Sequence, residues 1–329
     1  MLFHSLFELF FGMLLVLFSA LTFVNAVEFI GCELKLGSSF VGTILSPLFT
    51  SLPELIVFVV ALVSGVRGGE EISIGTIFGQ PFMASSLSYS LVGIATLLGY
   101  LRGKRVSPNL KVDKTLFFPY AFVTILFPLT LIPGFEKSMK LFFGVLFLLG
   151  FILYSILMYL KRSSGIIEES EELYFGKFLP ENVYSALIQL LVAVIILYYG
   201  SERLVSAVSN LSALTGISPL GISLILIPAA TAIPETASAI VWGYRGKDTL
   251  SLGSLVGEKI LYSTFYPGIA LVVTSWKIDD HAFFSVLTTT IISFLILYYI
   301  RKEEIPWSVL LTGMFFFFVY SILIFVFHS

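Results

Sequence analysis

The chain has 329 residues, of which 57% are apolar and only 12% are charged, and its mean hydropathy is +0.98. A soluble domain of this length could not bury so much apolar surface, so the composition indicates an integral membrane protein embedded in a lipid bilayer. The formal net charge of −2 gives no reason to expect a nucleic-acid partner, and the single cysteine, Cys32, excludes an intramolecular disulfide.

Ten apolar runs are long enough, at roughly 20 residues, to cross a membrane as helices. The predicted spans are 5–27, 37–64, 72–101, 115–134, 139–160, 182–206, 217–243, 249–275, 281–300 and 306–328. The first run ends in small residues that weakly imitate a signal cleavage site. No Lys or Arg precedes it, so we expect a membrane helix there rather than a signal peptide.

The loop at 161–181 is the only strongly polar stretch, and it divides the predicted helices into two groups of five. We expect an acidic, solvated, cytoplasmic linker at 161–181, between a first unit at 1–160 and a second unit at 182–329.

Lys and Arg residues concentrate in the loops on one side of the membrane. If the N-terminus lies outside, the inner loops hold 13 of them and the outer loops hold four. Cytoplasmic loops carry the excess of basic residues in membrane proteins. Both termini are therefore predicted to lie outside, and we expect the protein in the plasma (cell) membrane.

One short pattern, P-x-x-T-x-h-P-E with h apolar, occurs at 47–54 and again at 228–235. Each copy lies inside an apolar run, where a proline breaks the helix and a carboxylate is expensive. A G-x-x-x-G element follows each copy and ends in a polar residue, Gln80 in the first case and Glu258 in the second. The sequence therefore contains two related motif regions, 42–90 and 221–270.

Five helices per repeat is an odd number, so the second copy enters the membrane from the opposite side. Inverted-topology repeats are an architecture of secondary transporters, which bind substrate near the bilayer midplane between the repeats. We therefore predict an all-α transmembrane fold of ten helices, built as two inverted-topology repeats of five, with discontinuous helices at the repeated motifs.

The doubled motif places oxygen atoms on one face of each helix, because residues three and four apart share a face. The proline before each glutamate displaces the carbonyl four residues earlier, which a membrane tolerates only where that oxygen faces protein or water. The predicted cation-binding residues are Glu54, Glu235, Thr50, Ser51, Thr231, Phe49, Ala230, Pro47 and Pro228.

Hard cations suit such a set, since calcium takes six to eight oxygen ligands. A doubly charged ion would also neutralise Glu54 and Glu235, which we predict as the metal ligands. We expect no catalytic residue and no cofactor.

The G-x-x-x-G elements are expected mainly to let helices pack closely. The residues that follow them, Gln80, Glu258 and Lys259, are predicted as accessory or coupling residues. In one interpretation Glu258 lies in or beside the cation path and Lys259 neutralises it. In the alternative, Glu258 lies near an interface and Lys259 extends to water.

The motifs resemble those of the calcium/cation antiporter superfamily, which includes sodium/calcium and calcium/proton exchangers. The segments 49–54 and 230–235 resemble its G-T-S-L-P-E-like element, and 75–79 and 253–257 resemble its G-N-x-x-G-S-N-like element. The resemblance implies calcium binding by Glu54 and Glu235 with help from Thr50 and Thr231. It also implies alternating access by sliding of the first and sixth helices.

The chain departs from the pattern of the sodium/calcium exchangers at several polar positions. Gln80 and Glu258 replace serine, Ala84 and Tyr262 replace Asn or Asp, and Ala232 replaces a hydroxyl residue. These departures remove groups that would bind sodium. Protons are a plausible alternative counter-ion, because clustered carboxylates in a membrane bind protons cooperatively.

The function that these features favour is a secondary cation antiporter that exchanges calcium, or a related divalent cation, for sodium or protons. An uncoupled channel or uniporter and a transport-inactive structural relative remain alternatives. An enzyme is not expected, since no catalytic Ser-His arrangement or zinc-ligand cluster occurs. The sequence contains no feature that sets an oligomeric state.

Overall fold

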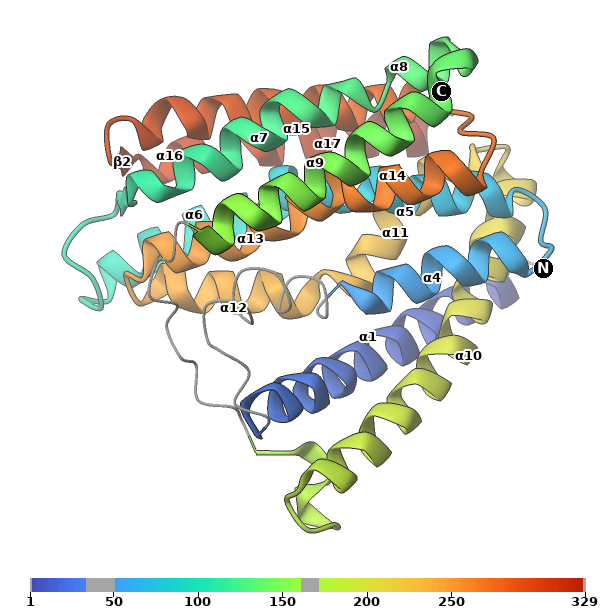
Figure 1. The fold of residues 1–329 in the computed structure, drawn as a ribbon, viewed down its shortest axis with the longest axis horizontal. Coiled ribbons are helices and arrows are strands. Elements are labelled where there is room, and N and C mark those ends of the chain that lie inside the picture. Colours follow the sequence, from blue (N-terminus) through green and yellow to red (C-terminus); the bar gives the residue numbers. More distant parts are fainter. Residues whose placement is uncertain (1, 34–50, 161–171, 328–329) are drawn as a thin grey trace.

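The computed structural model describes residues 2–33, 51–160 and 172–327, and most of this part is helical (Figure 1). The first half contains α1 (Leu2–Glu33), α4 (Leu52–Val63), α5 (Gly69–Met83), the π-helical turn η2 (Ala84–Ser88), α6 (Tyr89–Leu101), α7 (Phe117–Leu129), α8 (Ile132–Phe135) and α9 (Lys140–Leu160). The second half contains α10 (Val183–Thr215), α11 (Pro219–Thr231), α12 (Ile233–Tyr244), α13 (Asp248–Ser263), α14 (Phe265–Val273), α15 (Asp280–Ile300), α16 (Trp307–Leu310) and α17 (Thr312–Ile322). Short 3₁₀ turns lie at Lys114–Leu116, Lys137–Met139 and Tyr174–Lys177, a second π-helical turn lies at Leu323–Phe327, and β1 (Leu110–Lys111) and β2 (Glu304–Ile305) are two-residue strands.

Seven helices of the described part are long and apolar enough to cross a membrane, and an eighth span results if α11 and α12 are one broken helix. The predicted all-helical membrane architecture is confirmed. Three predicted spans are not single long helices: α4 is the only described helix of the span 37–64, the span 217–243 divides into α11 and α12, and the span 249–275 divides into α13 and α14 at Thr264. The count of ten spans stays a prediction.

The helix interruptions lie at related places in the two halves. The π-helical turn at Ala84–Ser88 begins five residues after Gly79, the second glycine of the first G-x-x-x-G element. The break at Thr264, where φ is −140° and ψ is −74°, follows Gly257 by seven residues. Kinks of this kind come from proline or from π-bulges, and Pro81 lies inside α5 just before η2.

A matched pair of hydrogen bonds supports the relation between the halves. The Ser73 hydroxyl of α5 donates to the Phe58 carbonyl of α4 at 3.0 Å. The Ser251 hydroxyl of α13 donates to the Ala239 carbonyl of α12 at 2.6 Å. Each serine lies two residues before a G-x-x-x-G element, so the same position ties corresponding helices together in both halves.

Helices α1 and α10 lie side by side and lean away from the rest of the bundle (Figure 1). Their contact is reciprocal. A Cβ atom on Gly12 would lie 2.8 Å from the Leu204 amide nitrogen, and one on Gly200 would lie 3.1 Å from that of Val16. Gly12 therefore faces the backbone four residues after Gly200, and Gly200 faces the backbone four residues after Gly12. The absence of side chains at both glycines lets the two helices approach closely.

The loops gather at two opposite ends of the molecule. At one end β1 pairs with β2, with Leu110 opposite Ile305, and Arg105 binds Asp248 at the start of α13. Both described chain ends lie at the other end, as Figure 1 shows. The loops after α6, α12 and α15, which the distribution of basic residues predicts to be cytoplasmic, therefore lie together at one end of the molecule.

The described part of the predicted linker, residues 172–181, folds against α1 and α10. The Asn25 side chain of α1 donates to the Glu172 carbonyl at 3.1 Å and accepts from the Tyr174 amide at 3.1 Å. Gln189 of α10 accepts from the Phe175 amide at 2.9 Å. These residues are thus attached to the helices, which the prediction of a solvated linker did not include.

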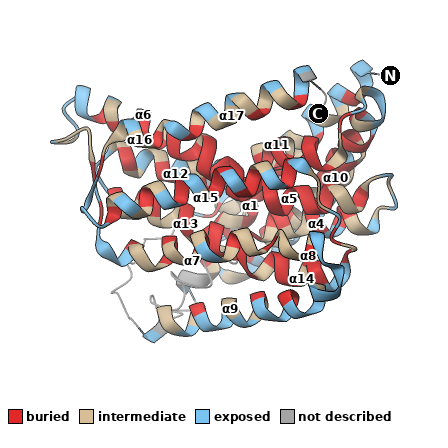
Figure 2. Ribbon diagram, turned by 90° about the horizontal axis from the view of Figure 1, so that it is seen from above, coloured by how far each residue is buried: buried red, intermediate tan, exposed pale blue. Residues whose placement is uncertain are grey.

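The most buried residues lie in a central group of helices that includes α5, α11, α13 and α15, while α9 and α17 turn exposed faces outward (Figure 2). Gly75 and Gly79 of α5 contact α11. A Cβ atom on Gly75 would overlap the Ser223 hydroxyl and lie 2.6 Å from the Leu220 carbonyl oxygen. The first G-x-x-x-G element therefore packs a helix of the first half against a helix of the second.

Gly75→Ala should lower the free energy of unfolding by about 1–3 kcal/mol, because the added methyl group overpacks the contact with α11. Thermal unfolding of the purified protein in detergent measures this loss. Gly150→Ala is the matched control, since its nearest described neighbour outside the helix backbone is the Leu126 Cδ1 atom at 3.5 Å. An equal melting temperature for the two variants would contradict the close packing.

Candidate cation-binding site

Glu54 and Glu235 lie in the first turns of α4 and α12. The α12 helix follows α11 after a bend of 62°, so Glu235 stands at a break in the chain's path through the membrane. The N-terminal end of a helix carries a partial positive charge and unpaired amide groups, which favour a carboxylate there. Both glutamates are buried, at 1% and 9% exposure.

The surroundings of Glu54 come from both halves of the chain. Gln80 of α5 donates from Nε2 to Glu54 Oε1 at 3.2 Å. The Thr231 side chain, at the end of α11, interacts with the same carboxyl group. The structure thus brings three of the predicted residues together, although they come from three different helices.

Glu258 of α13 is the third carboxyl group at this place and is 4% exposed. Its carboxyl group lies within electrostatic range of that of Glu235, and both lie within electrostatic range of Glu54. Carboxylates this close together repel one another when all are ionised, so the cluster favours the binding of cations or protons. The arrangement therefore brings three acidic side chains together.

Several oxygen atoms at this place have no hydrogen-bond partner in the described part of the chain. They are Glu54 Oε2, Gln80 Oε1, Glu235 Oε2, Glu258 Oε1 and the Tyr262 hydroxyl. Buried polar atoms are nearly always satisfied, so a cluster of unsatisfied oxygens is a site where a ligand would supply the missing interactions. Carboxylate, amide and hydroxyl oxygens suit hard cations such as calcium.

The acidic side chains are not arranged as a finished metal site. No group of three or more His, Cys, Asp and Glu residues within 2–33, 51–160 and 172–327 meets the geometry of one.

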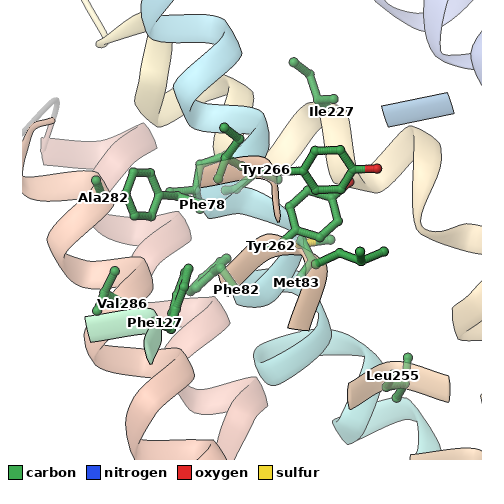
Figure 3. Packing of buried hydrophobic residues seen from close by; sticks show 14 of the residues in the cluster. Phe78, Phe82, Met83, Phe127, Ile227, Leu255, Tyr262, Tyr266, Ala282 and Val286 are labelled. Carbon is green, nitrogen blue, oxygen red and sulfur yellow. The ribbon is translucent and has the colours of Figure 1, made fainter. Parts of the chain in front are cut away.

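Two hydroxyl contacts flank the carboxyl cluster and cross between the halves. Ser51 and Tyr266 of α14 join their hydroxyl groups at 2.6 Å, and Tyr266 also donates to the Ser51 carbonyl at 2.9 Å. Ser88 of η2 and Thr236 of α12 join theirs at 2.7 Å. Figure 3 shows Tyr266 beside Tyr262, whose ring centroid is 4.6 Å away. Ser51 therefore lies at the site, next to a tyrosine from the other half.

The sequence and the fold of this chain are similar to those of known proteins. The sequence matches the family described as "Sodium/calcium exchanger protein" over residues 4–160 and 185–327. The chain belongs to this family. The match covers both motif regions and nearly the whole length of the chain.

Two curated relatives of this sodium/calcium exchanger family member are similar along most of its length. The putative antiporter CaxA of Alkalimonas amylolytica is 26% identical over 273 residues, which is 82% of this chain and 81% of CaxA. The inner membrane protein YrbG of Escherichia coli (strain K12) is 25% identical over 309 residues, which is 92% of this chain and 91% of YrbG.

Solved structures share the fold. The crystal structure of the H⁺/Ca²⁺ exchanger CAX matches with a TM-score of 0.79 at 16% identity, covering 98% of this chain and 83% of that one. The sodium-calcium exchanger NCX_Mj matches with a TM-score of 0.57 at 20% identity, covering 98% and 99%.

Some residues that the motif predicts for this family site lie elsewhere or outside the described residues. Pro47, Phe49 and Thr50 fall outside them. The Pro228 carbonyl accepts the Ala232 amide at 2.9 Å, and the Pro228 ring packs where Gly79 leaves room, while its role in cation binding stays a prediction. Ala230 is buried in the last turn of α11, and its freed carbonyl stays a prediction.

Lys259 does not neutralise Glu258, and it does not extend to water. It is 1% exposed, and its Nζ atom donates to the Ser293 hydroxyl of α15 at 2.7 Å. The same Nζ atom lies over the rings of Tyr89 and Tyr120, at 5.0 and 5.9 Å from their centroids. Both interpretations of the Glu258-Lys259 pair are thus wrong for Lys259, because successive side chains on a helix point about 100° apart.

Sequence reasoning missed the tyrosines of this site. Tyr262 stood out only as a replacement for Asn or Asp, although its hydroxyl lies within electrostatic range of the carboxyl groups and has no hydrogen-bond partner in the described part. Tyr266 lies four residues later, on the far side of the break at Thr264. Their spacing is a signal of a shared face, but only the broken helix explains why both reach the cluster.

Proposed function

We propose that this chain is a secondary active antiporter that moves calcium, or a related divalent cation, across the membrane in exchange for sodium or protons. The observation that carries the proposal is the group of three buried carboxyl groups, Glu54, Glu235 and Glu258, with unsatisfied oxygens between two half-helix ends. A divalent cation would neutralise that charge and fill the vacant interactions. CaxA, named as an antiporter, and CAX, named as an H⁺/Ca²⁺ exchanger, support it by similarity.

The proposed architecture is ten spans in two inverted repeats, 1–160 and 182–329, joined by the cytoplasmic linker 161–181. The matched bonds of Ser73 and Ser251 support it, as do the reciprocal contacts of Gly12 and Gly200. In an inverted repeat the two copies face each other across a pseudo-twofold axis, which places their broken helices at the same depth. Glu54 and Glu235 then meet from opposite sides of the membrane.

Alternating access in this proposal is a movement of α1 and α10 as a pair past the remaining helices. Their glycine-lined contact makes the pair a unit, and α1 leans away from the central helices (Figure 1). Movement of a packed pair changes which side of the bundle opens to the carboxyl cluster without unfolding either helix.

The departures at Gln80 and Glu258 remove hydroxyl groups that would bind sodium, which favours protons as the counter-ion. The cluster of three buried carboxyl groups supports the same choice, because closely spaced carboxylates bind protons more readily than isolated ones. Sodium stays the alternative. We place the protein in the plasma membrane with both termini outside, and we propose no enzymatic activity and no cofactor.

Calcium uptake into proteoliposomes under separately imposed proton and sodium gradients tests this function. We expect uptake driven by an outward-directed proton gradient, and collapse of that gradient with an ionophore should stop it. Uptake driven only by an outward-directed sodium gradient would assign sodium as the counter-ion. Uptake that follows the calcium gradient alone would identify an uncoupled channel or uniporter, and no uptake under any gradient would identify a transport-inactive protein.

A further inference from the structure

Glu70 and Asp248 occupy equivalent places at the starts of α5 and α13. Each lies in the first turn of its helix. Each also lies five residues before the first glycine of a G-x-x-x-G element, which is Gly75 in the first half and Gly253 in the second. Two residues before each acidic residue stands a glycine with a positive φ, of 76° in the first half and 77° in the second. The two acidic residues are therefore the same element of the repeat.

Each of these residues binds a loop of the opposite half. Asp248 accepts hydrogen bonds at 2.9 Å from each of two guanidinium nitrogens of Arg105 and at 2.7 Å from the Lys111 amide, both in the segment that follows α6. Glu70 Oε1 accepts from the Ser275 amide at 2.5 Å and from the Ser275 hydroxyl, in the loop after α14. The loop that binds α13 thus belongs to the first half, and the loop that binds α5 belongs to the second.

The two contacts lie at opposite ends of the molecule. Figure 1 shows that α5 begins and α14 ends near the described chain ends, while α13 begins at the other end. Gln80 and Glu258 each lie ten residues after the acidic residue of their helix, which is about 15 Å along the axis. Each contact is therefore equally far from the residue that its helix contributes to the candidate site.

Each contact holds the start of a helix whose other end is interrupted. The α5 helix runs into the π-helical turn at Ala84–Ser88, and α13 ends at the break at Thr264. Gln80 and Glu258 lie near these interrupted ends. Such an interruption lets the two parts of a span differ in direction, so the following helix does not by itself fix the one before it. The contact at the start then helps to determine where each helix lies.

We propose that Glu70 and Asp248 are equivalent positioning residues, which hold α5 and α13 so that Gln80 and Glu258 keep their places in the cation site. Glu70 acts through α5 on Gln80, which donates to Glu54 at 3.2 Å. Asp248 acts through α13 on Glu258. This inference rests on the proposed function, because it takes Gln80 and Glu258 as parts of a calcium site.

Equilibrium binding of radioactive calcium to the purified full-length chain tests the inference. Glu70→Ala should weaken calcium binding about three- to tenfold, because α5 then no longer holds the Gln80 carboxamide in place. The same substitution in a Gln80→Ala chain should cause no further loss, since the side chain that α5 positions is then absent. Asp248→Asn should weaken binding by a similar factor in both chains, because it acts through α13.

Matched variants separate the contact from the charge. Glu71→Ala removes the same charge from the same turn of α5, and the Glu71 side chain makes no hydrogen bond to the residues that the structure describes. Its calcium affinity should equal that of the unmodified chain. Ser275→Ala removes only the hydroxyl donor and should cause a smaller loss than Glu70→Ala, whereas Ser275→Thr keeps both donors and should cause none.

A folded Glu70→Ala protein, verified by circular dichroism and gel filtration, that binds calcium as well as Glu71→Ala would overturn the inference. An equal loss from Glu70→Ala with and without Gln80 would also overturn it and leave Glu70 a residue of general stability. If Glu70→Ala does not fold, Ser275→Ala in the two chains supplies the same comparison.

Amide hydrogen exchange distinguishes a failure of this inference from a failure of the proposed function. Absence of calcium binding by the unmodified chain would overturn the proposed function, whereas exchange reports on the helices without calcium. Glu70→Ala should raise exchange in α5 but not in α13, and Asp248→Asn should do the reverse. Exchange that is unchanged in both variants would overturn the positioning role.

Discussion

Glu54→Gln and Glu235→Gln should each abolish calcium flux and weaken calcium binding by at least about 100-fold. Each substitution keeps the size of the side chain but removes a negative charge from a site that must match a divalent cation. An unneutralised charge near the bilayer centre costs about 2.5–3.5 kcal/mol, and 1.4 kcal/mol corresponds to a factor of ten. Proteoliposome uptake and equilibrium binding of radioactive calcium give the two numbers.

Glu181→Gln is the matched control, because Glu181 is exposed beside the N-terminus of α10 and should tolerate the change in both assays. Thr231→Ala should give a smaller loss than either glutamine variant, since it removes a neutral hydroxyl that interacts with Glu54. Calcium flux that persists in both glutamine variants would place the transport site elsewhere.

The meeting of the two motif glutamates was predictable from the sequence for a physical reason. A carboxylate in an apolar run costs so much that its repetition indicates a shared role, and an odd number of helices per repeat, five, implies opposite orientations of the two copies. The structure places Glu54 and Glu235 within electrostatic range of each other and adds Glu258 to them. Their role as cation ligands stays a prediction.

The surroundings of Lys259 could not be predicted from the sequence. Its Nζ atom contacts Ser293 and lies over the rings of Tyr89 and Tyr120. Ser293 lies 34 residues after Lys259, and the two tyrosines lie 170 and 139 residues before it. No local pattern links residues that far apart in the chain. The adjacent Glu258 suggested an ion pair because its charge is opposite and it is the next residue in the sequence. In a helix, however, side chains of consecutive residues point in different directions.

Helix interruptions were only partly predictable. Proline indicated the break near Glu235, where α11 ends and α12 begins. The break at Thr264 lies three residues before Pro267, and there the packing of Tyr262 and Tyr266 against each other accompanies the change of direction. Local preferences are weak compared with such tertiary contacts, so the span 249–275 was predicted as one helix.

A buried ion pair was not predicted either, because its two residues lie far apart in the sequence. It lies at the end of the bundle where β1 pairs with β2. Arg105 and Asp248 are 5% and 4% exposed, and the two guanidinium nitrogens each donate to a carboxylate oxygen at 2.9 Å. Arg105 also donates to the carbonyls of Gly243 and Asn109, and Asp248 accepts the Lys111 amide at 2.7 Å. This pair therefore ties the loop after α6 to the start of α13.

Arg105→Met should lower the free energy of unfolding by about 3–5 kcal/mol, because it leaves the Asp248 carboxylate buried without its partner. Thermal unfolding in detergent, read by circular dichroism, measures the loss. Adding Asp248→Leu should recover part of it, since an apolar pair of similar volume often replaces a buried ion pair without net cost. The exposed pair of Lys114 and Glu303 supplies the control, and Lys114→Met should cost no more than about 1 kcal/mol. If the single Arg105 variant were as stable as the Lys114 variant, the buried pair would not hold the two halves together at this end.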